Sequence, residues 1–162
     1  MDVITLTKEN LEKEHICCAI SNNKDCQVAA KKAWIARQLD AGLMFKKCDV
    51  RGKCFIEYIP AEEAWAPILA EGYMYIDCLW VSGKFKGQGY STLLLDECIK
   101  DSRAKGKKGL AVLSSPKKGP ISLTRTSSDI KASNWRIQQC RTTNYYTCLS
   151  IKLPGNRSSE SR

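Results

Sequence analysis

The spacing of apolar and polar residues predicts short strands alternating with amphipathic helices along the first 115 residues. Alternating or continuous apolar runs predict strands at 3–6, 43–50, 54–59, 74–81 and 109–115. Apolar residues at helical spacing predict helices at about 9–20, 26–41 and 91–105. The order β, α, α, β, β, β, α, β indicates an α/β (α+β) domain in which helices cover a central sheet.

Local signals support this arrangement. Val50-Arg51-Gly52-Lys53 is a hairpin signal, and Gly42 stands where a helix C-terminal cap belongs. The run 74–81 is nearly continuously apolar, which predicts a strand in the middle of the sheet. The strand at 109–115 follows a helix, so we expect it to lie parallel to the strand before that helix.

The charge of the chain is divided unevenly. A length of 162 residues suits one domain, and the formal net charge is +9. Residues 1–100 carry 13 Lys or Arg and 14 Asp or Glu, whereas residues 101–162 carry 13 and 3. The whole basic excess lies in the last third, so the main body is neutral. Nucleic acid is therefore an unlikely partner for it.

Cysteine usage and hydropathy predict a reduced, cytoplasmic protein. The chain has nine cysteines, an odd number, and several lie inside apolar strand or helix patterns. We find no export signal and no apolar run long enough to cross a membrane. The sequence has no Cys-x-x-Cys pair, Cys17 and Cys18 are adjacent, and His15 is the only histidine, so we expect no metal site.

One turn between a strand and a helix carries the clearest chemical signal. Its residues 84–91 read Lys-Phe-Lys-Gly-Gln-Gly-Tyr-Ser, between the apolar run 79–81 and the helix that follows. Such a turn directs bare backbone N–H groups at an anion, and Gly87 and Gly89 allow close approach to the main chain. Lys84 and Lys86 add positive charge. We interpret the turn as a cradle for a diphosphate; the alternative is a purely structural turn.

The segment Val81-Ser-Gly-Lys-Phe-Lys86-Gly-Gln-Gly89-Tyr-Ser91 resembles the acetyl-coenzyme A signature of the GNAT N-acetyltransferases, (Gln/Arg)-x-x-Gly-x-(Gly/Ala). Lys86 and Ser91 depart from that signature, yet lysine still offers charge to phosphate and serine is small. The resemblance covers residues 1–115. It implies that acetyl-CoA is bound through Lys86, Gly87, Gln88, Gly89, Tyr90 and Ser91.

The resemblance also implies the rest of the cofactor site. In this family the fourth and fifth strands splay apart, and the pantetheine arm enters the gap. Backbone groups of Leu79, Trp80 and Val81 would then pair with that arm and polarise the thioester carbonyl. Ser114 would face the arm from the fifth strand.

By the same resemblance, an amine of a small molecule or peptide attacks the thioester directly. Asp77 is the best-placed base by sequence, four residues before Val81 and on the same strand face; the alternative is a strand-end carboxylate paired with a lysine. Glu57 is the weaker candidate. Cys78 is expected to be a small buried side chain rather than a nucleophile.

Other candidates receive structural interpretations. His15 is expected on the exposed face of the first helix, and Trp34 and Trp80 in the core. No general acid can be assigned, since Tyr145 and Tyr146 lie in surroundings that do not match the family.

The family pattern stops after Lys118. We divide the chain into an acetyl-CoA-binding domain, 1–118, and an atypical basic tail, 119–162, so the C-terminal strands are missing or altered. If the last base of each codon is read with the first two of the next, Asn134-Trp135 must yield Leu and Asn144-Tyr145-Tyr146 must yield Leu-Leu. We therefore hypothesise a shift of reading frame near 117–120; the alternative is a disordered basic tail.

The sequence predicts an N-acetyltransferase of unknown acceptor. Two other functions stay open, a remnant that binds coenzyme A at most and a basic nucleic-acid-binding protein. The neutral main body disfavours the latter. The oligomeric state has no signal in the sequence.

Overall fold

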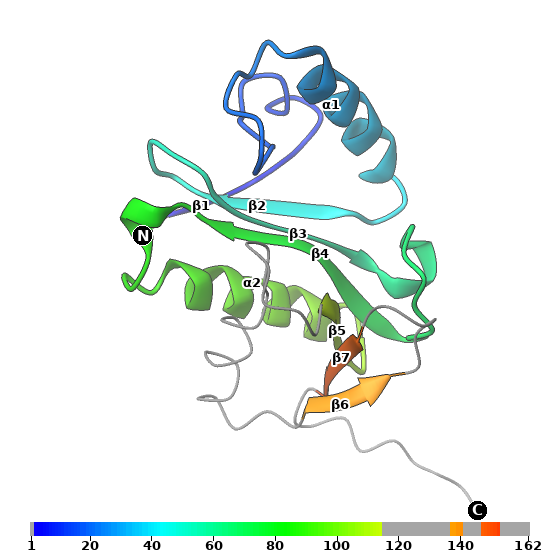
Figure 1. The fold of residues 1–162 in the computed structure, drawn as a ribbon. Coiled ribbons are helices and arrows are strands. Elements are labelled where there is room, and N and C mark those ends of the chain that lie inside the picture. The colour runs from blue at the N-terminus through cyan, green and yellow to red at the C-terminus, as the bar shows by residue number, and fades with distance from the viewer. Residues whose placement is uncertain (1, 115–136, 141–146, 153–162) are drawn as a thin grey trace, which may run out of the picture.

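A single mixed sheet with one helix on each face forms the fold of the computed structural model, which describes residues 2–114, 137–140 and 147–152 (Figure 1). The strand order is β1-β2-β3-β4-β5-β7-β6. The strands are β1 Val3–Thr5, β2 Met44–Cys48, β3 Cys54–Pro60, β4 Tyr73–Val81, β5 Gly109–Ser114, β6 Ile137–Cys140 and β7 Thr147–Lys152; the helices are α1 Cys26–Gln38 and α2 Tyr90–Ala104. Two 3₁₀ turns lie at Ala61–Glu63 and Gly83–Phe85.

The strand pairing confirms the expected central arrangement. Strands β1 to β4 are antiparallel neighbours, and β4 pairs in parallel with β5. The chain passes from β4 through α2 to β5, which is the predicted strand–helix–strand unit. Helix α1 ends at Gln38 with Leu39 as its C-cap, so the expectation that Gly42 caps it was wrong. Gly42 ends the turn that follows, with φ +94°, a left-handed conformation that glycine adopts at little cost.

The helix expected at about 9–20 is absent, and this prediction was wrong. The segment forms turns at 8–13 and no helix follows. The Asn10 side chain accepts from the Thr7 amide and caps this first turn, but the Glu12 carbonyl, which a continuing helix would use, accepts from Lys32 of α1. Leu11 and Ile16 are nevertheless buried in the core, so the apolar positions were identified correctly while their backbone conformation was not.

The C-terminal strands are present, so the expectation that they are missing was wrong. β7 pairs antiparallel with β5 along six residues, and β6 pairs with β7 at the end of the sheet. Backbone hydrogen bonds of this kind are available to every residue except proline, whatever the side chain. The sequence pattern was uninformative here because too few apolar residues mark the strands. The rest of 119–162, with the hypothesised frame shift, lies outside the described residues.

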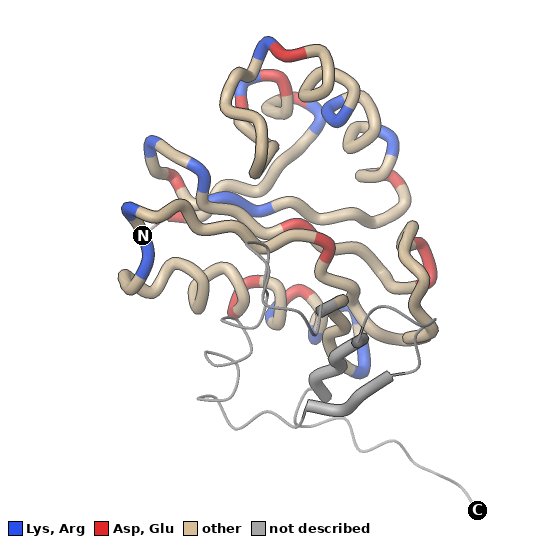
Figure 2. Tube along the Cα trace, viewed as in Figure 1, with Lys and Arg blue, Asp and Glu red and all other residues tan. Residues whose placement is uncertain are grey.

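The sheet separates two hydrophobic layers. Strand residues Ile56, Met74 and Ile76 pack against Leu94 and Cys98 of α2. On the other face, Phe45, Phe55 and Tyr75 pack with Val28 and Ile35 of α1. Each helix therefore covers one face, as Figure 1 shows. Charged residues of both signs are distributed along the described chain (Figure 2).

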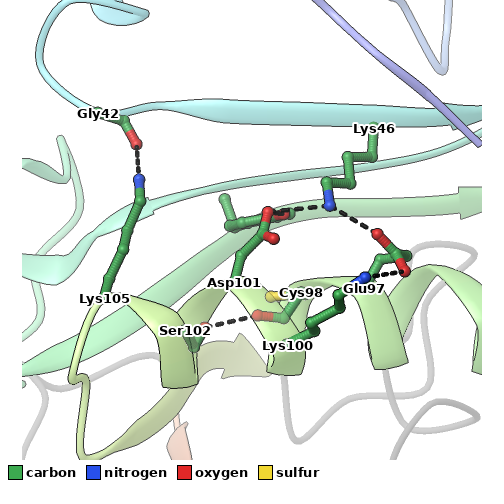
Figure 3. A network of polar contacts seen from close by, with 9 residues as sticks. Gly42, Lys46, Glu97, Cys98, Lys100, Asp101, Ser102 and Lys105 are labelled. Carbon is green, nitrogen blue, oxygen red and sulfur yellow. Dashed lines mark hydrogen bonds and ion pairs between the residues drawn. The ribbon is translucent and has the colours of Figure 1, made fainter.

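A buried polar network fixes α2 on the sheet (Figure 3). Lys46 of β2 contacts Glu97 at 2.7 Å and Asp101 at 3.0 Å, and the Lys46 side chain is only 7% exposed. Ser102 donates to the Cys98 carbonyl within the helix. Helix α2 begins directly after Gly89, so this network also fixes the position of the helix N-terminus relative to the sheet.

Candidate active site

The loop between β4 and α2 is open, as a ligand cradle requires. Gly87 and Gly89 have φ of +77° and +82°, and both are exposed. A Cβ atom added at either glycine would meet no atom within 4 Å. Gly89 is the N-cap of α2 and offers no capping side chain, so the first amides of the helix, from Tyr90 onward, keep their hydrogen-bonding capacity. The loop can therefore present donors and a helix dipole to an anion.

The two lysines of this loop differ in their engagement. Lys84 Nζ donates to the Arg51 carbonyl at 2.6 Å and lies 4.7 Å from the Phe85 ring centroid. The expectation that Lys84 supplies charge to the cradle was therefore wrong, because its ammonium is held at the β2–β3 hairpin. The Lys86 side chain is exposed and makes no hydrogen bond or ion pair within the described part of the chain, while the Lys86 backbone N–H donates to the Gly83 carbonyl at 3.2 Å. Gln88 turns back and donates to the Lys84 carbonyl, which closes the loop.

Strands β4 and β5 separate next to this loop. Their pairing runs from Tyr73 with Gly109 to Ile76 with Val112 and ends there. The last five residues of β4, 77–81, continue beside β3, whereas β5 continues beside β7. The backbone edge of Leu79, Trp80 and Val81 thus faces a gap in the pairing. An extended ligand can add hydrogen bonds to such an edge.

A β-bulge marks the point of separation. Glu57 pairs with Cys78 and Tyr58 with Ile76, so Asp77 is left without a partner on β3. The bulge breaks the alternation of faces along β4. Val81 packs on the α2 side, whereas Asp77 interacts with Lys31 of α1. The expectation that Asp77 and Val81 share a face was therefore wrong.

Charged groups gather on the α1 side of this bulge. Glu57 is 0% exposed, and its Oε2 accepts from Lys31 Nζ at 2.7 Å. Its other oxygen, Oε1, is buried without a hydrogen-bond partner among the described residues. Burial raises the pKa of Glu57, and the nearby Lys31 opposes that rise. Partial desolvation likewise raises the pKa of Asp77, whose side chain remains exposed to solvent.

These positions separate the two carboxylate candidates. Asp77 is exposed to solvent, whereas Glu57 is buried in an ion pair with Lys31. Cys78 is half-buried, and burial raises its pKa well above the ordinary value for a thiol, as expected for a packing residue. Trp34 and Trp80 pack at the edge of the α1-side core, as expected, although Trp80 Nε1 is buried without a partner among the described residues.

The remaining candidate residues lie away from this site or outside the described part of the chain. His15 is half-buried in the turns after β1, its Nε2 3.0 Å from the Cys17 carbonyl, rather than on an exposed helix face. The Ser114 side chain, Tyr145 and Tyr146 lie outside the described residues. Among the described residues, no group of three or more His, Cys, Asp or Glu is placed to hold a metal ion.

Sequence reasoning missed Lys31, which carries no distinguishing pattern. Helical lysines are ordinarily solvated, and Lys31 stands next to a second lysine, Lys32. The single available signal was Asp77 itself, an acidic residue inside a nearly continuous apolar strand. Glu57, which pairs with the neighbouring Cys78, is buried, and a buried carboxylate needs a cation, which Lys31 of α1 supplies.

The chain belongs to the acetyltransferase (GNAT) family, whose sequence model matches residues 8–117. It is 47% identical over 121 residues to the uncharacterized N-acetyltransferase YoaP of Bacillus subtilis (strain 168). That alignment covers 74% of this chain and 48% of the relative, so the chain spans about half of the relative's length. GNAT proteins are acyltransferases, and the predicted family is confirmed.

Solved structures show the same fold. The yncA protein of Salmonella typhimurium, a putative acetyltransferase with its cofactor acetyl-CoA, is similar with a TM-score of 0.63 at 12% identity, covering 98% of this chain and 95% of that one. The ribosomal-protein-alanine N-acetyltransferase of Brucella melitensis gives a TM-score of 0.61 at 12% identity, covering 94% and 99%. No helix in the described part of the chain is long and apolar enough to span a membrane.

Proposed function

We propose that this protein transfers an acetyl group from acetyl-CoA to an amine. The main support for the proposal is that an unpaired strand edge and an open glycine loop lie next to each other. Strand β4 leaves β5 after Ile76, and the open glycine loop 86–91 follows directly from the free end of β4. A site for an extended chain and a site for an anion are therefore continuous, as a nucleotide thioester requires.

The residues fit the co-substrate in chemistry. Amides of Gly87, Gln88, Gly89, Tyr90 and Ser91 would bind the diphosphate. Lys86 would contribute the point charge of its ammonium rather than its amide, which already donates to the Gly83 carbonyl. The backbone of Leu79, Trp80 and Val81 would pair with the pantetheine amides. The same strand would donate to the thioester carbonyl oxygen as negative charge develops there.

Asp77 is the proposed base. The acceptor must lose a proton before or during its attack on the carbonyl carbon, where a C–N bond forms and the C–S bond breaks. Asp77 lies at the bulge, exposed and three residues from the middle of the pairing edge. Its raised pKa favours a carboxylate that accepts protons more readily than an ordinary surface aspartate.

The acceptor is a small-molecule or peptide amine in this proposal. The Brucella relative is named for a ribosomal-protein alanine, while the YoaP relative carries no acceptor in its name. At 12% identity the former shows the fold alone.

The test begins with calorimetric titration of the full chain with acetyl-CoA, for which we expect saturable binding. Gly89→Asp places a carboxylate against the diphosphate and should abolish that binding. Gly106→Asp is the matched control, since Gly106 also has a positive φ and open surroundings but lies at the other end of α2. Release of coenzyme A thiol with a panel of primary amines then tests transfer. Undiminished affinity in Gly89→Asp would overturn the site.

A further inference from the structure

Asp77 lies beside a lysine and a second carboxylate that reach it from two different elements. Lys31 extends from α1, and Glu57 stands on β3 opposite Cys78, the residue next to Asp77. The Lys31–Glu57 contact is 2.7 Å long, with Glu57 fully buried and the Lys31 side chain 27% exposed. The pair thus lies under the bulge rather than on the open surface.

A net gain in stability does not by itself explain why this pair is buried here. A buried ion pair is weak support for stability, because the desolvation of both charges offsets their attraction. Here the cost is larger than usual, since Glu57 Oε1 has no hydrogen-bond partner among the described residues. We therefore look for an electrostatic role of the buried Glu57 carboxylate.

We infer that Lys31 and Glu57 act as a matched charge pair that sets the proton affinity of Asp77, Lys31 by stabilising its carboxylate and Glu57 by opposing it. This inference rests on the proposed function in treating Asp77 as the base. Lys31 and Glu57 are positioning residues in it, because neither needs to touch the acceptor.

The surroundings of Asp77 support opposite effects of the two partners. Lys31 lowers the pKa of Asp77 against the desolvation that raises it. The charge of Asp77 in turn adds to the raised pKa of Glu57, as expected of two neighbouring carboxylates that disfavour each other's ionised form. Cys78 on β4 and Cys18 from the turns before α1 complete the titratable groups here, and burial keeps the Cys78 thiol protonated at neutral pH. Among the described residues, Lys31 and Glu57 are therefore the titratable groups whose charge bears on Asp77.

The inference makes predictions of opposite sign. Lys31→Met should raise the pKa of Asp77 by about one unit, because the stabilising cation is lost. Glu57→Gln should lower it, because a repelling anion is lost while Lys31 remains. The double variant should return it close to the value of the unchanged protein, and Lys31→Arg should preserve that value.

The experiment is a carbon-13 NMR titration of the Asp77 carboxyl in the full chain, which requires neither co-substrate nor acceptor. Lys32→Met is the matched control: Lys32 is the next residue of α1, and its ammonium donates to the Glu12 carbonyl rather than to Glu57. Shifts of opposite sign in Lys31→Met and Glu57→Gln, with none in Lys32→Met, support the inference. An unmoved Asp77, or shifts of the same sign, overturn it.

Two further measurements keep the outcomes distinct. If Lys31→Met does not fold, Glu57→Gln decides alone, since only a lowered pKa of Asp77 fits. Acetyl-CoA calorimetry on the same samples tests the proposed function separately, so a failure to bind leaves the titration result interpretable. Where transfer is measurable, the acidic limb of kcat/KM should shift in the same direction as the Asp77 titration.

Discussion

The Tyr58 hydroxyl donates a hydrogen bond to Asp101 Oδ2 at 2.6 Å and so joins strand β3 to helix α2. Asp101 also receives Lys46 at 3.0 Å, and Lys46 reaches Glu97 at 2.7 Å one turn earlier on the helix. Glu97 and Asp101 lie seven and eleven residues downstream of Tyr90, where α2 begins. The orientation of the proposed cradle therefore depends on a polar network on the side of the sheet away from Asp77 (Figure 3).

Removing Lys46 should destabilise the protein markedly. Lys46→Met leaves Glu97 and Asp101 partly buried without their shared cation, and we expect a loss of about 2–4 kcal/mol in the free energy of unfolding. Lys100→Met is the control, because Lys100 is 76% exposed and 3.9 Å from Glu97. It should change stability by less than about 0.5 kcal/mol. Urea unfolding measures both, and equal losses would contradict the assignment.

The same network predicts a loss of stability at alkaline pH. Burial disfavours the Lys46 ammonium, but hydrogen bonds to Glu97 and Asp101 outweigh it and raise the pKa of Lys46. A raised pKa in the folded state gives stability that is complete below the unfolded value, about 10.4, and is lost as the pH rises through the folded value. The stability difference between the unchanged protein and Lys46→Met should therefore shrink above about pH 10.4. A stability difference that stays constant up to about pH 11.5, roughly one unit above the unfolded value, would contradict a raised pKa of Lys46.

The two loop lysines should have unequal effects on acetyl-CoA binding. Lys86 is free to meet the diphosphate, and Lys86→Ala should weaken binding about three- to tenfold. Lys84→Ala should leave affinity nearly unchanged, since its ammonium already binds the Arg51 carbonyl. The Lys86 effect should decrease with added salt. Calorimetry at two ionic strengths checks the order, and a larger effect at Lys84 would reverse our assignment.

The strands and helices that the sequence predicted correctly are those with a clear local pattern of apolar residues or a glycine turn. β4, α2 and β5 were located within one or two residues because apolar runs and the glycine turn mark them. The helix expected near 9–20 failed because apolar residues at 11, 16 and 20 were interpreted by spacing, whereas the Glu12 carbonyl, which a continuing helix would use, binds Lys32 from a distant part of the chain. Burial was predictable there, and conformation was not.

The site was predictable only where backbone chemistry forms it. Gly87 and Gly89, placed between an apolar strand and a helix, predicted an open loop, and the structure has open space at both positions. The bulge at Asp77 has no residue signature, so the face of that side chain could not be derived by counting. The Lys31–Glu57 contact joins residues 26 apart in the chain, and a single sequence carries no sign of such a pairing.

Cysteine reactivity should divide by burial. Cys48 and Cys54 are both 0% exposed with their Sγ atoms 3.3 Å apart, and burial raises the pKa of Cys54 to about 12. Cys26 is exposed at the start of α1. At pH about 8, near the ordinary thiol pKa, iodoacetamide should label Cys26 quickly and the buried pair only on unfolding, as peptide mass spectrometry can show. Rapid labelling of Cys48 in the native protein would contradict the described packing.

The hypothesised change of reading frame makes a prediction about the gene. The family match ends at residue 117, where the predicted break begins. Read one base earlier, the codons of 129–150 should encode Tyr-Lys-Gly-Phe-Lys-Leu-Ala-Asp-Thr-Ala-Val-Pro-Tyr-Tyr-Glu-Leu-Leu-Tyr-Leu-Pro-Phe or a closely similar string. That string has the alternating and continuous apolar residues expected of strands, which the present sequence largely lacks. The same shift applied to the codons of 91–112 is the control and should produce no such pattern. Sequencing the gene and its transcript decides the matter, because codons that cannot encode the apolar string would leave β6 and β7 as strands that this frame itself specifies.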